Sequence, residues 1–134
     1  MSAIKDGRLP ITLDKERHML FSLNAIDAVE DKIGDIGNLE EEMNKKGRMK
    51  LIKWLFTLLL NEGAAFTKYL ETGTTEGAEV LTEDTVGLLL NGVNLTSMTS
   101  NIYKSLALSS KGDADAPEEP QEDEEGNTEA GKEN

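Results

Sequence analysis

The sequence contains no cysteine, a single histidine and few aromatic residues: three Phe, two Tyr and one Trp. The absence of cysteine excludes disulfide bonds, thiolate nucleophiles and sulfur-bound zinc, and it fits a reducing compartment. His18, the one histidine, has no second histidine or cysteine with which to build a metal site or a triad, so we interpret it as a partly exposed strand residue. No set of residues supplies a nucleophile, a base and an orienting group, so we expect a non-catalytic protein without metal or cofactor.

Long apolar runs are missing as well. The longest, Leu51–Leu60, has ten residues and includes Lys53 and Thr57, which is about half of what a membrane-spanning helix needs. The first residues also lack the apolar run of a signal peptide. We therefore expect a soluble, cytoplasmic protein that does not bind membranes.

Positive charge is scarce: the 134 residues include 14 basic and 26 acidic ones, which gives a net charge of −12. Phosphate backbones repel such a chain, so we do not expect it to bind nucleic acid. Residues 111–134 hold ten acidic and two basic residues, a net −8, which leaves −4 for residues 1–110. Because residues 111–134 contain no aromatic or large aliphatic side chain, we predict one domain over 1–110 and a disordered acidic tail over 111–134.

One basic cluster, Lys45–Lys53, stands out in this acidic chain and follows directly on Glu40–Glu42. Contact with nucleic acid is one interpretation of such a cluster. Neutralisation within the chain, by the neighbouring glutamates and the acidic tail, is the interpretation we favour.

The hydrophobic pattern at the start of the domain predicts a small β-hairpin. Ile11 and Leu13 share one face of an extended strand over residues 9–13. A turn at residues 14–15 would bring residues 16–21 back beside this strand. Helix remains an alternative for that second run, because its apolar residues do not alternate cleanly.

Helical spacing of apolar residues predicts about four short amphipathic helices after the hairpin. The first has its N-cap at Ser22 or Asn24 and ends at Gly34, and residues 39–46 add a short exposed turn. The strongest, with Trp54 at the edge of its wide apolar face, begins at Gly47. It either stops at residues 61–63 or continues through residue 70.

The last two predicted helices follow a polar, glycine-rich stretch, residues 72–79, which we interpret as a mobile loop. Thr82 caps the first of them, which ends at residues 91–92, and Asn94 caps the second, which frays near Ser109. The predicted fold class is mainly α (α+β): a small N-terminal β-hairpin, about four short amphipathic helices and a disordered acidic C-terminal tail.

Several segments carry a resemblance to a known family. They are Ile11–Arg17, Leu20–Gly34, Trp54–Phe56 and Leu81–Leu89. Their order resembles that of the tail assembly chaperones of long-tailed phages and prophages of Gram-positive bacteria, over roughly residues 11–108. The resemblance implies a self-associating, non-catalytic protein that coats the tape measure protein and helps recruit tail tube subunits. It also implies action in the host cytoplasm and absence from the mature virion.

Such a role calls for apolar contact surface on the helices, and aromatic side chains supply it at little entropic cost. We nominate Trp54, Phe56, Phe66 and Tyr69 as partner-binding residues, with core packing as the alternative for each. A different interpretation of the same helices is a small acidic regulatory or scaffold protein that binds a single host or phage protein. A metal-dependent or nucleotide-processing enzyme is a third interpretation, which the residues favour least.

The resemblance further implies a second, longer form of the protein, made by a −1 ribosomal slip near the stop codon. Gly131-Lys132-Glu133 is what a slippery GGGAAAG heptanucleotide encodes in the zero frame, so we predict the slip there. The acidic tail would then link the coating body to a second domain that recruits tube subunits.

Overall fold

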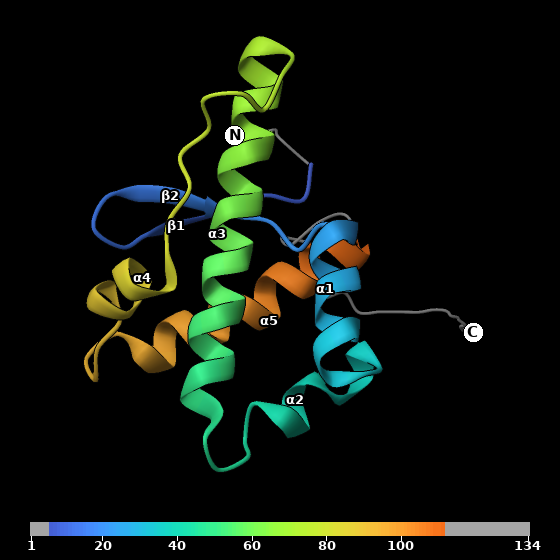
Figure 1. The fold of residues 1–134 in the computed structure, drawn as a ribbon, viewed down its shortest axis with the longest axis vertical. Helices are drawn as coiled ribbons and strands as arrows, with labels where there is room; N and C mark the ends of the chain where they lie inside the picture. Colours follow the sequence, from blue (N-terminus) through green and yellow to red (C-terminus); the bar gives the residue numbers. More distant parts are fainter. Residues whose placement is uncertain (1–5, 112–134) are drawn as a thin grey trace.

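A computed structural model of the protein describes residues 6–111. Two strands are followed by five α-helices and one short 3-10 turn, which confirms the predicted mainly α class with an N-terminal hairpin (Figure 1). The elements are β1 (Leu9–Thr12), β2 (Glu16–Met19), α1 (Leu23–Ile33), η1 (Ile36–Asn38), α2 (Leu39–Glu42), α3 (Arg48–Thr72), α4 (Glu83–Leu89) and α5 (Leu95–Lys111). The acidic tail was predicted over residues 111–134, but Lys111 is the last residue of α5. The rest of the predicted tail, with the slip site at residues 131–133, lies outside the described residues.

Strands β1 and β2 form an antiparallel pair in which Leu9 faces Met19 and Ile11 faces Arg17. The predicted hairpin is therefore confirmed, and the helical alternative for its second run is wrong. Ile11 and Met19 are buried against the core. The hairpin lies against α3, because the backbone N–H of Leu20 donates to the carbonyl of Leu59 at 3.1 Å.

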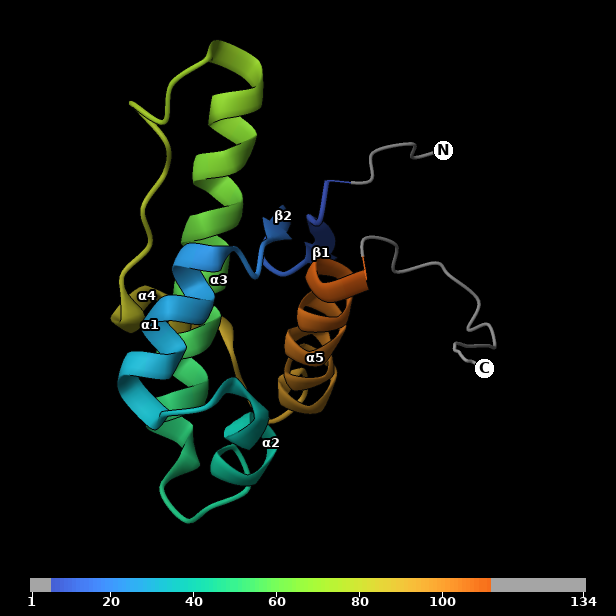
Figure 2. The ribbon, with the colours of Figure 1, turned by 90° about the vertical axis from the view of Figure 1, so that its right-hand side faces the viewer.

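Helix α3 lies at the centre of the fold, and the hairpin, α1, α4 and α5 lie around it (Figures 1 and 2). It has 25 residues and passes through residues 61–63 without a break, so the longer of the two predicted lengths is correct. It ends at Thr72, and the next residue, Gly73, caps it with a left-handed φ of 84° that favours glycine. Within residues 6–111, no helix is long and apolar enough to cross a membrane.

The core lies between α3 and the elements around it. Ser22 caps α1, since its hydroxyl accepts from the N–H of Ala25 at 3.0 Å and donates to Glu62 of α3. Helix α2 differs from the exposed turn expected over residues 39–46. Leu39, and Met43 just after the helix, are buried. The largest fully buried apolar side chains are Phe21, Phe56, Met19, Leu39, Leu55, Leu59, Ile102, Val29 and Val86.

Candidate partner-binding site

The four nominated aromatic residues all lie on α3, but in different surroundings. Phe56 is fully buried in the core, so the alternative of core packing holds for this residue. Its position follows from the wide apolar face of α3, which turns Leu55, Phe56 and Leu59 inward together. Tyr69 is 52% exposed near the end of the helix. Trp54 and Phe66 are half-buried.

Cations cover both half-buried aromatic rings. The Nζ of Lys32, on α1, lies 4.8 Å from the centre of the Trp54 ring. The guanidinium of Arg8 lies 5.8 Å from the centre of the Phe66 ring and donates to the hydroxyl of Thr67 at 2.9 Å. Such cation–π contacts connect α1 and the N-terminal segment to α3. Trp54 and Phe66 therefore hold the fold together in addition to any contact with a partner.

The structure does not bring the nominated residues into one surface. Trp54 and Phe66 are twelve positions apart on one helix, which is about 18 Å along its axis. Phe66 and Tyr69, three positions apart, are neighbours on the helix surface. Of the four, only this pair offers adjacent aromatic surface, and Tyr69 supplies most of its exposed part.

A groove opens where the first turns of α3 meet α4 and the start of α5. These elements lie at the lower left of Figure 1. We call this groove the α3–α4–α5 groove. Its volume is about 360 Å³, and its lining is mainly apolar. The lining residues are Met49, Lys50, Ile52, Lys53, Gly87, Leu90, Asn91, Gly92 and Leu95.

Two apolar side chains stand in solvent next to this groove. Leu88 is 84% exposed and Val93 is 95% exposed, and each directly follows a lining glycine, Gly87 or Gly92. Gly87 has a packing role, because a Cβ there would lie 3.1 Å from the Cδ of Lys53. The small residue thus lets the Lys53 stem lie against α4 at the edge of the groove.

Local hydrogen bonds fix the two ends of α4 and so shape the groove. Thr82 caps the helix as predicted, accepting from the N–H of Thr85 at 3.1 Å. At the other end, Asn91 and Asn94 bond to each other's backbone: Asn91 N–H donates to Asn94 Oδ1 at 2.9 Å, and Asn94 N–H donates to Asn91 Oδ1 at 3.1 Å. Asn94 Nδ2 also donates to the carbonyl of Leu89 at 3.0 Å. The Asn94 side chain therefore secures the turn between α4 and α5 rather than capping α5 as predicted. Helix α5 remains helical through Lys111 rather than ending near Ser109.

Positive charge gathers on the α3 side of the groove. Lys50 and Lys53 line it, and Lys46 and Arg48 precede them by a few positions. Within the part of the chain that the structure describes, none of these four has a carboxylate within ion-pair distance. Lys45, by contrast, is paired with Glu42 at 2.8 Å. The groove thus combines an apolar floor with a cationic edge.

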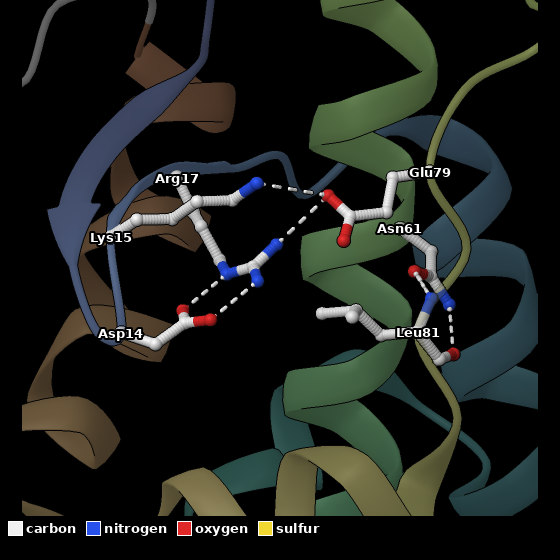
Figure 3. A network of polar contacts seen from close by, with 6 residues as sticks. All are labelled: Asp14, Lys15, Arg17, Asn61, Glu79 and Leu81. Carbon is white, nitrogen blue, oxygen red and sulfur yellow. Dashed lines mark hydrogen bonds and ion pairs between the residues drawn. The ribbon is translucent and has the colours of Figure 1, made fainter.

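A second, polar cavity of about 270 Å³ lies between the hairpin, α3 and residues 77–79. Glu79 accepts from Arg17 at 3.2 Å and lies 3.6 Å from Lys15 (Figure 3). The loop predicted over residues 72–79 is thereby tied to the hairpin at its last residue. Burial, reinforced by the Arg8 charge, lowers the pKa of His18, which lines this cavity and is half-buried, as predicted for a strand residue.

Sequence reasoning placed the binding surface on aromatic residues and missed the α3–α4–α5 groove. A signal was present: Leu88 and Val93 are large apolar residues that follow Gly87 and Gly92 around the junction of the last two predicted helices. Among residues 6–111, no cluster of His, Asp and Glu side chains is arranged to hold a metal ion. Comparison of the chain with known protein families, characterised proteins and solved structures finds no match.

Proposed function

We propose that the protein is a non-catalytic tail assembly chaperone of a long-tailed phage or prophage. It holds the tape measure protein in a soluble form, associates with further copies of itself along that partner, and helps recruit tail tube subunits. The observation that carries the proposal is the α3–α4–α5 groove, with Leu88 and Val93 exposed beside it. The resemblance of the element order to that family supports it.

An apolar groove between helices suits a helical partner. An amphipathic helix binds such a groove by inserting side chains from one face, spaced three and four residues apart. The floor formed by Ile52, Leu90 and Leu95 offers apolar contact to that face. Exposed Leu88 and Val93 extend the apolar surface beyond the cavity, and exposed apolar patches commonly mark interaction sites.

Co-expression with the tape measure protein encoded in the same tail gene cluster tests the proposal. We expect the full chain to keep the tape measure protein soluble and to co-purify with it. The double variant Leu88→Ser/Val93→Ser removes the exposed apolar contacts and should lower the co-purified amount about tenfold, the effect of two contacts of about 0.7 kcal/mol each.

Leu23→Ser is the matched control, because Leu23 is 82% exposed but lies on α1, away from the groove. It should leave co-purification unchanged. A tape measure protein that stays insoluble and unbound with the wild-type chain would contradict the proposed function. Equal capture by the double variant would instead place the binding surface elsewhere on the molecule.

A further inference from the structure

The described part of the chain carries a cluster of unpaired cations at the start of α3. Five of the 14 basic residues of the sequence lie within residues 45–53, and this stretch holds no acidic residue. Lys46, Arg48 and Lys50 are exposed, and Lys53 is half-buried. Among the other cations, Arg8, Lys15 and Arg17 are each paired with a carboxylate. We call Lys46, Arg48, Lys50 and Lys53 the α3 cationic cluster.

The chain itself supplies a ligand of opposite charge. Residues 112–134 contain ten acidic residues and one basic residue, a net charge of −9. Six of the carboxylates fall within residues 118–125. This segment has no large apolar side chain, so it complements the cationic cluster and not the apolar floor of the groove.

We propose that the acidic segment 112–134 binds the α3 cationic cluster of its own chain. The contact covers the cationic edge of the α3–α4–α5 groove and leaves the apolar floor open. This proposal stands on the charge distribution and does not depend on the identity of the partner.

The segment is long enough to reach the cluster. Its 23 residues span at most about 75 Å when extended, at about 3.3 Å for each residue. Helix α3, the longest element with 25 residues, is about 37 Å long. Starting from Lys111 at the end of α5, the segment can therefore reach the first turns of α3 with length to spare.

Paramagnetic relaxation in the full chain tests the contact. Because the sequence has no cysteine, Thr128→Cys creates a single position for a nitroxide label. In ¹⁵N-labelled protein at about 0.05 M salt, we expect the nitroxide to weaken the amide signals of residues 46–53. The reference is the same sample after the nitroxide has been chemically reduced to its diamagnetic form. At about 1 M salt the signals should recover, because the screening length falls to about 3 Å.

Charge reversal locates the contact. The triple variant Lys46→Glu/Arg48→Glu/Lys50→Glu, all exposed positions, should abolish the signal loss, with unchanged amide shifts in α5 showing that the fold persists. Lys104→Glu, an exposed cation on α5, is the matched control and should preserve it. Full signal at residues 46–53 in low salt, or loss that survives the triple variant, would overturn the proposal. So would an equal loss when nitroxide-labelled ¹⁴N protein is mixed with ¹⁵N chains that carry no nitroxide, since the ligand would then be a second copy.

Discussion

The side-chain amide of Asn61 pairs with both backbone polar groups of Leu81. Asn61 Nδ2 donates to the Leu81 carbonyl at 3.0 Å, and the Leu81 N–H donates to Asn61 Oδ1 at 2.8 Å (Figure 3). The two bonds satisfy the backbone N–H and C=O of residue 81, as a neighbouring strand would in a sheet. They attach the segment between α3 and α4 to the middle of α3, just before the Thr82 cap.

Asn61→Ala should lower the free energy of unfolding by about 1–3 kcal/mol, because it leaves two backbone groups of Leu81 without their partner. Urea unfolding measures this loss. Hydrogen exchange at the Leu81 amide should accelerate in the same variant. Asn44→Ala is the control: its side chain makes one exposed bond, to the carbonyl of Glu40, and the change should stay within about 0.5 kcal/mol. Equal losses in the two variants would contradict a special role for Asn61.

Gly63→Ala should destabilise the protein although alanine is the better helix former by about 1 kcal/mol. A Cβ at this position would collide with the backbone carbonyl of His18, so strand β2 would have to move away from α3. Overpacking of this kind costs about 1–3 kcal/mol. Gly92→Ala, where nothing lies within 4 Å of the added Cβ, should change stability by less than about 0.5 kcal/mol. A Gly63→Ala variant that is more stable than the wild type would contradict this prediction, because it would show that β2 can move away from α3 at little cost.

Asn61 and Gly63 also show where sequence reasoning reaches its limit. Local rules predicted the hairpin alternation and the caps at Ser22 and Thr82 correctly, because each depends on residues a few positions apart. The same rules allowed α3 to stop at residues 61–63, since both residues favour helix ends. Contacts with Leu81 and His18, each about 20 or more positions away, explain these residues instead. The groove was missed for the same reason, because it forms only when residues 49–53 meet residues 87–95.

Ser105→Ala should stabilise the protein by about 1 kcal/mol. Ser105 is fully buried on α5, and its hydroxyl has no hydrogen-bond partner among residues 6–111. A buried hydroxyl without a partner carries an uncompensated desolvation cost, which the alanine removes. Thermal unfolding of the two proteins measures the difference. Ser22→Ala, which removes the N-cap of α1, should have the opposite sign and cost about 1 kcal/mol. Destabilisation by Ser105→Ala would indicate that the hydroxyl has a partner.

Alanine substitution should affect the stability of the protein very differently at two of the nominated aromatic residues. Phe56→Ala empties a fully buried position and should cost about 3–5 kcal/mol of unfolding free energy. Tyr69→Ala, at a half-exposed position, should change stability by less than about 0.5 kcal/mol. Urea unfolding of both variants measures the contrast. A loss of several kcal/mol in Tyr69→Ala would place Tyr69 in the core and remove it from the candidate surface.

Acid should weaken the hairpin turn through Asp14. Arg17 donates to both of its carboxylate oxygens, at 2.7 and 2.8 Å, and these hydrogen bonds lower the pKa of Asp14 from 3.8 to about 2. A depressed pKa in the folded state contributes stability that is fully present above pH 3.8 and is lost as the pH falls through about 2. Asp14→Asn should therefore flatten the pH dependence of the unfolding free energy across this window.

The Asp14 carboxyl resonance gives a direct reading, and its titration midpoint should fall near pH 2. A midpoint near 3.8 would mean that the Arg17 pair does not persist in solution. In that case the turn at residues 14–15 would depend on the β1–β2 backbone ladder alone.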